Sequence, residues 1–245
     1  MATTLTTHPD QDHGRVRPPI HKHRIPLSNY WAKMIMAVTG LVFVAFVFIH
    51  MYGNLHIYFG GEEFDHYAHW LREAFMPVLP YSGLLWILRI VLLGCLVLHV
   101  FCALLIAARA RRARGRFRRK GLGMNTFGAR SMLVTGIVLL LFVIFHILDL
   151  TVPVPPLATD VFVHGEAYAN LVASFSRPWA SAVYIVAMLV LTVHIAHGVW
   201  TAAHDLGVTG KRTRAIFYLA GGIIGLLIAI GNITIPVAVL LGVLA

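Results

Sequence analysis

Residues 33–55, "KMIMAVTGLVFVAFVFIHMYGNL", form an almost continuously apolar run that is long enough to cross a membrane as one helix. At about 1.5 Å of rise per residue, such a run covers a hydrocarbon layer of about 30 Å. His50 stands near the end of this run, where a lipid-facing helix would carry leucine. A polar side chain at this depth usually faces the interior of a bundle, so His50 indicates a functional site inside the membrane.

The composition of the whole chain agrees with this first run. The 245 residues are 58% hydrophobic and 12% charged, and the mean hydropathy is +0.77, values typical of an integral membrane protein. Five apolar stretches are long enough to span a bilayer: roughly 30–53, 81–108, 131–150, 180–203 and 214–243. A membrane β-barrel would show alternating segments of about ten residues instead. The sequence therefore predicts an all-α membrane protein with a bundle of five transmembrane helices.

The distribution of basic residues predicts the orientation of the bundle. Of the 20 basic residues, 17 lie before or at the start of the first span, between the second and third, or before or at the start of the fifth, including the run "RARRARGRFRRK" at 109–120. Since cytoplasmic loops are enriched in Lys and Arg, we expect a cytoplasmic N-terminus and an external C-terminus. This sidedness accounts for the formal charge of +10 without nucleic-acid binding, and anionic lipid or an acidic partner would meet the basic face.

The segments outside the five spans carry weaker signals. Residues 1–28 read as a polar cytoplasmic arm, and residues 29–245 as the transmembrane domain. In the first outer loop, "EEFDHYAHWLREAFMP" predicts a short interfacial helix. In the second outer loop, "TVPVPP" predicts extended chain, and "VHGEAYANLVASF" predicts weak helix. We expect no cleaved signal peptide and no internal repeat.

Histidines inside the spans provide the most specific signal. Of 14 histidines, five lie in apolar runs: His50, His99, His146, His194 and His197. Counting from the membrane faces places His50 about 25 Å and His146 about 22 Å from the cytoplasmic face. The same count places His99 about 25 Å and His194 about 21 Å from the outer face. Two histidines therefore share each of two levels, although any single one could be a packing histidine bonded to a carbonyl.

Two imidazoles at one level on different helices are what a haem iron needs as axial ligands. Two such levels predict two haems stacked across the membrane. Gly53 and Gly94 lie close in sequence to His50 and His99. They would allow a flat macrocycle to approach the backbone, although ordinary packing of membrane helices also uses glycine.

Four sequence segments resemble a known family. They are residues 33–55 quoted above, "RIVLLGCLVLHVFCALL" (89–105), "GIVLLLFVIFHILDL" (136–150) and "FSRPWASAVYIVAMLVLTVHIAHGVW" (175–200). Together with the motifs "HMxGN" and "HxxHGxW", they resemble the cytochrome b membrane anchor of succinate dehydrogenase and fumarate reductase, in its five-helix, two-haem form. The resemblance covers about residues 28–240. It implies that His99 and His194 bind the cytoplasmic-side haem b, and that His50 and His146 bind the outer one.

The resemblance also implies a role and partners. A flavoprotein subunit and an iron–sulfur subunit would dock on the cytoplasmic face, where the 109–120 run could contact them or merely enforce topology. Electrons would pass between succinate and menaquinone or ubiquinone, as in respiratory complex II and the tricarboxylic acid cycle. The chain would be a subunit outside the catalytic core of the enzyme, in a bacterial inner or plasma membrane. The complex could also form an oligomer.

Further residues are candidates for cofactor and quinone contacts. Arg89 and Arg130 could meet haem propionates, although Arg89 could instead extend toward the outer interface. His197 could bond a propionate or a backbone carbonyl. At the cytoplasmic mouth of the first span, a quinone carbonyl could meet Ser28, Tyr30, Trp31 or Lys33, although these also suit an interfacial anchor. On the outer side, Glu73 could exchange a proton with quinol or could be a solvated loop residue.

Three alternatives remain open from sequence alone. Cys95, His99 and Cys102 share one helix face and could hold a Rieske-like [2Fe–2S] cluster with a second histidine, but the sulfurs would be about 10.5 Å apart along the axis. A non-redox transporter or channel subunit could use the histidines for protons or metal ions. The third alternative is a cytochrome b anchor of another dehydrogenase or of a hydrogenase.

Overall fold

The computed structural model describes residues 27–114 and 124–245, with side chains omitted for 114 and 124–130. These residues form helices without any strand. The helices are α1 (Asn29–Asn54), the 3₁₀ helix η1 (Leu55–Phe59), α2 (Gly61–Glu73), α3 (Gly83–Arg114), α4 (Met124–Leu150), α5 (Ala167–Phe175), α6 (Pro178–Asp205) and α7 (Lys211–Leu240). Residues 1–26 of the predicted arm, and 115–120 of the basic run, lie outside the described part.

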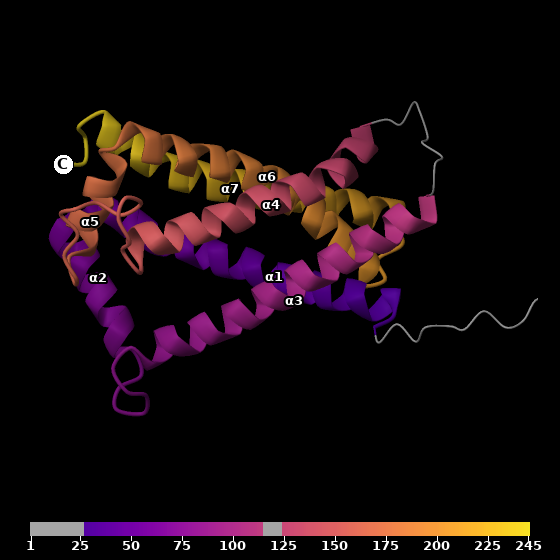
Figure 1. Cartoon of the computed structure of the whole chain (residues 1–245), viewed down its shortest axis with the longest axis horizontal. Coiled ribbons are helices and arrows are strands. Elements are labelled where there is room, and N and C mark those ends of the chain that lie inside the picture. Colours follow the sequence, from indigo (N-terminus) through magenta and orange to yellow (C-terminus); the bar gives the residue numbers. More distant parts are fainter. Residues whose placement is uncertain (1–26, 115–123) are drawn as a thin grey trace, which may run out of the picture.

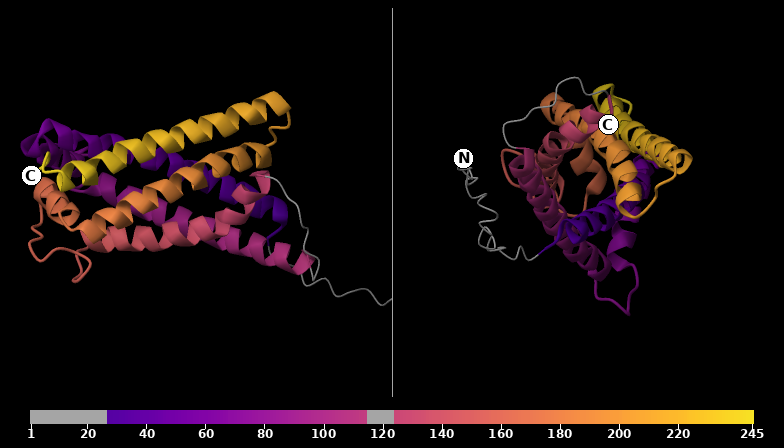
Figure 2. Two further views of the ribbon diagram at one scale, coloured as in Figure 1. Left: turned by 90° about the horizontal axis from the view of Figure 1, so that it is seen from above. Right: turned by 90° about the vertical axis from the view of Figure 1, so that its right-hand side faces the viewer.

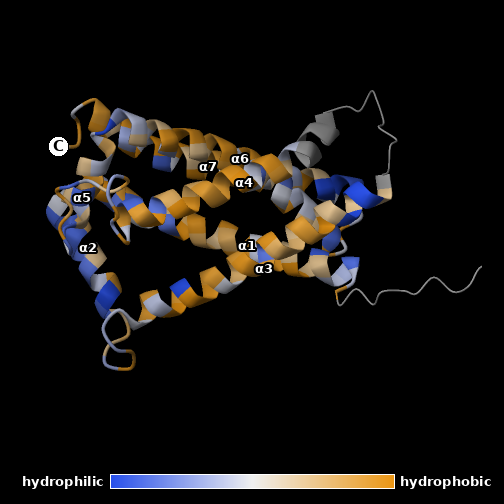
Figure 3. Ribbon diagram, in the orientation of Figure 1, coloured by the Kyte–Doolittle hydropathy of each residue, from blue (hydrophilic) through white to orange (hydrophobic). Residues whose placement is uncertain are grey.

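Five of these helices are long and apolar enough to cross a membrane: α1 with η1, α3, the part of α4 from Ser131, α6 and α7. Successive spans run in opposite directions along the long axis of the bundle (Figure 1). Apolar residues cover their middle, and polar residues gather at the two ends (Figure 3). The prediction of five transmembrane helices is confirmed.

The helices begin and end at recognisable signals. The Ser28 side chain accepts a hydrogen bond from the backbone N–H of Trp31 and caps α1. Pro178 occupies the first turn of α6, where a missing N–H costs nothing. After α6, Gly207 takes a positive φ of 99° and turns the chain toward α7.

The two ends of the bundle differ in character. At one end, here called the basic end, α1, α4 and α7 begin and α3 and α6 finish (Figure 1). At the opposite end, here called the loop end, lie η1, α2, α5 and the C-terminus. The helices α2 and α5 confirm the two short helices predicted in the outer loops.

The packing order of the spanning helices determines which side chains can meet. The most extensive contact joins α6 to α7, and α1 packs against both α3 and α6, while α4 packs against α6. In the described residues, close backbone contacts are few or absent between α1 and α4, between α3 and α6, and between α3 and α4. Figure 2 (right) views this arrangement from the basic end. Helices α1 and α4, and likewise α3 and α6, therefore lie diagonally across a four-helix arrangement.

Candidate functional site

The structure brings His50 and His146 together across one diagonal. His50 lies on α1 and His146 on α4, and their ring centroids are 5.9 Å apart at an interplanar angle of 78°. Because a metal–imidazole nitrogen bond is about 2 Å long, two rings on opposite sides of one metal have centroids about 6 Å apart. The spacing of these two rings fits that arrangement.

His99 and His194 occupy the other diagonal, on α3 and α6. They are neighbours in space. The Nδ1 atom of His99 is 3.1 Å from Thr39 Oγ1 on α1, and that of His194 is 3.0 Å from Thr135 Oγ1 on α4. Each histidine is thus held by a hydroxyl of the helix packed beside its own.

The hydroxyl contacts indicate the tautomer of these two histidines. A threonine hydroxyl has one hydrogen, and both threonines donate it to the carbonyl four residues earlier, at 2.7 Å for Thr39 and 2.9 Å for Thr135. Their oxygens therefore accept from the Nδ1–H groups of His99 and His194. The Nε2 lone pair of each ring is left available, which is the form that binds a metal.

His146 has the same tautomer, but its hydrogen-bond partner is a tyrosine. Its Nδ1 is 3.3 Å from Tyr184 Oη, and Tyr184 donates its own hydrogen to Asp149 Oδ2 at 2.9 Å. The phenolic oxygen therefore accepts from His146. For His50, a stacked contact with Phe46 at 5.5 Å sets the ring plane.

The threonine contacts reveal an internal repeat, so the expectation of no repeat is wrong. Residues 39–50, "TGLVFVAFVFIH", match 135–146, "TGIVLLLFVIFH", in Thr, Gly, Val, Phe, Val and His at equal positions. Each Thr-Gly pair contacts the histidine of a neighbouring helix: a Cβ on Gly40 would lie 3.3 Å from His99 Cε1, and one on Gly136 would lie 3.7 Å from His194 Cε1. Within each repeat the terminal histidine lies 11 residues on, or about 16 Å along the helix. This places the two histidine pairs at different levels.

Five of these residues were missed by sequence reasoning: Thr39, Gly40, Thr135, Asp149 and Tyr184. The repeat was the available signal for the threonines and Gly40. For Asp149 the signal was its position three residues after His146, on the same helix face. Nothing in the sequence marked Tyr184, which comes from another helix.

The two predicted cofactor glycines differ in their surroundings. A Cβ on Gly53 would lie 2.8 Å from Tyr67 Oη, so this glycine admits the Tyr67 side chain. Burial and the neighbouring Tyr52 raise the pKa of Tyr67. A Cβ on Gly94 would meet nothing within 4 Å. Their part in a cofactor site stays a prediction.

The candidate propionate partners also differ. Arg89 lies over the Trp86 ring at 5.1 Å. His197 is half-buried one turn beyond His194, in contact with Trp200 at 5.4 Å. Arg130 falls in α4, outside the residues whose side chains are described.

The quinone candidates lie at both ends of the bundle. Ser28 and Lys33 line a pocket at the basic end, with Asn29 and Arg109 among its other residues. Lys33 also forms an ion pair with Asp205 at 3.0 Å.

The remaining quinone candidates are surface residues. Tyr30 and Trp31 are exposed, with their rings edge-to-face at 5.3 Å. Glu73, at the loop end, lies 3.4 Å from His69 one turn earlier in α2.

The two cysteines are free: Cys95 is half-buried and Cys102 is buried. Across the described ranges, no group of three or more His, Cys, Asp or Glu side chains could hold a metal ion. The alternative of a cluster held by Cys95, His99 and Cys102 therefore gains no support from the structure.

The fold and these side chains define the class of the protein: a multi-pass helical membrane protein with histidines paired across the bundle. Residues 109–230, about half of the chain, match the family described as the succinate dehydrogenase/fumarate reductase transmembrane subunit. The match supports this family and indicates a membrane anchor that assembles with the other subunits of that oxidoreductase complex. No curated protein and no solved structure shows a significant match to the chain.

Proposed function

We infer that this chain is the cytochrome b subunit of a succinate:quinone oxidoreductase, with two haems b each bound by two histidines. The observation that carries the proposal is the arrangement of the histidines. His99, His146 and His194 present a free Nε2 because Nδ1–H donates to a hydroxyl. His146 meets His50 at the spacing of two axial ligands.

The chain's own residues hold and separate the two sites. Thr39 and Thr135 orient the His99 and His194 pair nearer the basic end, and Tyr184 orients His146 nearer the loop end. The haems supply one-electron transfer. The pairs lie about 16 Å apart along the helices, so that each site has its own hydrogen bonds to its histidines and therefore its own potential.

The proposed partners follow from the charge at the basic end. The described part of this end carries Lys33, Arg109, Arg111, Arg112, Arg114, Lys211, Arg212 and Arg214. A cytoplasmic location of this end agrees with the positive-inside rule and places it where the flavoprotein and iron–sulfur subunits dock. Electrons would then move from that end toward the His50 and His146 pair, or the reverse in fumarate reduction.

Two regions are proposed for quinone. The pocket beside Ser28 and Lys33 offers donors for a quinone carbonyl at the basic end. Glu73 is the candidate for proton exchange at the loop end. Membrane menaquinone or ubiquinone, and a bacterial inner membrane, complete the proposal.

The test is haem content in the purified complex. We expect a reduced-minus-oxidised spectrum with haem b bands and about two haems per chain, one for each histidine pair. His194→Ala should remove one haem and leave the other. His204→Ala is the matched control, because His204 is an exposed histidine on the same helix, and it should retain both. A wild-type complex without a Soret band, or a His194→Ala complex with both haems, would contradict the proposal.

A further inference from the structure

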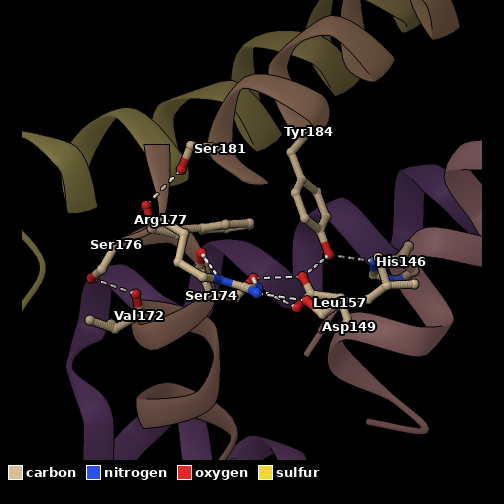
Figure 4. A network of polar contacts seen from close by, with 10 residues as sticks. His146, Asp149, Leu157, Val172, Ser174, Ser176, Arg177, Ser181 and Tyr184 are labelled. Carbon is tan, nitrogen blue, oxygen red and sulfur yellow. Dashed lines mark hydrogen bonds and ion pairs between the residues drawn. The ribbon is translucent and has the colours of Figure 1, made fainter. Parts of the chain in front are cut away.

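A chain of buried polar side chains leads from His146 to the loop end (Figure 4). Tyr184 Oη lies 3.3 Å from His146 Nδ1 and donates to Asp149 Oδ2 at 2.9 Å. Asp149 is 1% exposed. It also accepts from Ser174 Oγ at 2.6 Å and from Arg177 Nη2 at 2.6 Å. Three helices, α4, α5 and α6, and the Arg177 linker thus contribute to one network.

The positions of the hydrogens in this network follow from its donors. Arg177 is always charged and donates only, and an ionised Asp149 accepts only. Ser174 and Tyr184 therefore each donate to the carboxylate. The hydrogen of Tyr184 is committed to Asp149, so its oxygen can only accept the Nδ1–H of His146.

This arrangement separates His146 from the other histidines of the two pairs. His99 and His194 donate to threonine hydroxyls, whose hydrogens go to neutral carbonyl groups. His146 donates to a phenol that is bound to a buried carboxylate. Among the described contacts of the four histidines, the link to a carboxylate belongs to His146.

We propose that Tyr184 and Asp149 are positioning residues that hold His146 in its Nδ1–H tautomer and strengthen its Nε2 as an iron ligand. The inference rests on the proposed function and adds a difference between the two haems. A carboxylate acting through a hydrogen bond makes a ligand histidine more basic. A more basic ligand stabilises ferric over ferrous iron, so this network lowers the potential of the haem at His50 and His146.

The test is a redox titration of the assembled complex carrying Tyr184→Phe. The substitution keeps the ring, which has edge contacts with Phe142, Phe145 and Phe175, and removes the acceptor for His146. We expect the ferric preference of one haem to fall by up to about tenfold, which raises its midpoint potential by up to about 59 mV. The low-spin electron paramagnetic resonance signal of the same haem should shift. The midpoint potential and the resonance signal of the other haem should stay unchanged.

The control is Tyr168→Phe, which makes the same change at the loop end in a tyrosine bonded to the Ala245 carbonyl. It should leave both potentials unchanged. Asp149→Asn is the second variant, since it keeps the shape and removes the charge, and it should move the same haem in the same direction. Loss of that haem alone in either variant would also support the proposal.

Three outcomes would overturn the inference: unchanged potentials in Tyr184→Phe, equal shifts of both haems, or an effect of Tyr168→Phe as large as that of Tyr184→Phe. If Tyr184→Phe fails to assemble, Asp149→Asn decides by the same criteria, and failure of both variants to assemble assigns the network to folding and overturns the inference. A wild-type complex that lacks haem refutes the proposed function instead, so the two failures are distinguishable.

Discussion

Asp149 is the most deeply buried charged residue in the described part of the chain. Its side chain is fully buried, whereas that of its partner Arg177 is 21% exposed. A buried carboxylate without its cation carries an uncompensated charge, and removing one partner of such a pair typically destabilises a protein strongly. Arg177 also donates to the Leu157 carbonyl and lies over the Trp179 ring, so it ties the loop between α4 and α5 to the bundle.

We expect Arg177→Met to lower the free energy of unfolding by about 3–5 kcal/mol. Arg212→Met is the matched control, because it makes the same change at an exposed arginine. Its cost should stay within about 1 kcal/mol. Unfolding in mixed detergent and denaturant, followed by circular dichroism, measures both. Equal losses in the two variants would contradict the role given to burial.

The sequence predicted the histidines of the site but not the residues that hold them. Levels along a helix follow from counting because the rise per residue is constant, which is why His50 could be matched with His146. A threonine or tyrosine in an apolar run does not reveal which helix it faces. The helices that Thr39, Thr135 and Tyr184 contact therefore became known only with the order of helices around the bundle.

At the scale of elements, α6 and α7 pack through two glycines of α7. A Cβ on Gly225 would lie 3.1 Å from the Thr192 carbonyl oxygen, and one on Gly221 would lie 2.9 Å from Val199 Cβ. Thr192 Oγ1 also donates to the Gly225 carbonyl at 3.1 Å. Two small residues four apart let membrane helices approach closely.

Gly225→Leu should separate the two helices and destabilise the protein by about 1–3 kcal/mol, the usual cost of overpacking. Gly222→Leu lies three residues away in the same helix, at a position where a Cβ would meet nothing within 4 Å, and it should cost little. Thermal unfolding in detergent, with both variants purified in parallel, makes the comparison. A loss in Gly222→Leu as large as that in Gly225→Leu would show that loss of glycine itself, rather than close packing, is responsible.

The helix boundaries show what hydropathy detects. The second apolar run ends near 108, yet α3 continues to Arg114, and α7 begins at Lys211, before its apolar run near 214. Hydropathy marks the part inside hydrocarbon, whereas the helix continues into the headgroup region, where Arg and Lys remain solvated. Pro236 lies inside α7, which continues to Leu240.

For the whole molecule, the structure places the described basic residues of three separate segments at one end of the bundle. That end is also where α1 begins, opposite the C-terminus (Figure 1). The absolute orientation follows from the positive-inside rule and is a prediction.

Reporter fusions test this orientation. Alkaline phosphatase joined after Ala245 should be active and green fluorescent protein joined there should be dark, because the C-terminus is expected outside the cytoplasm. The same reporters inserted after Gly210, between α6 and α7, should give the reverse result and serve as the internal control. Active phosphatase at Gly210 would invert the proposed docking face.

The tight pairing of α6 with α7 also matters for biogenesis. Among the five spans, these two leave the ribosome last, yet α1 packs against both and α4 packs against α6. During synthesis, α1 and α3 can therefore pack against each other, whereas α4 enters the lipid before its main partner α6 exists. If synthesis stops before Pro178, the product lacks both α6 and α7. Polar histidines of the remaining spans would then face lipid. We expect membrane quality-control proteases to degrade such a product.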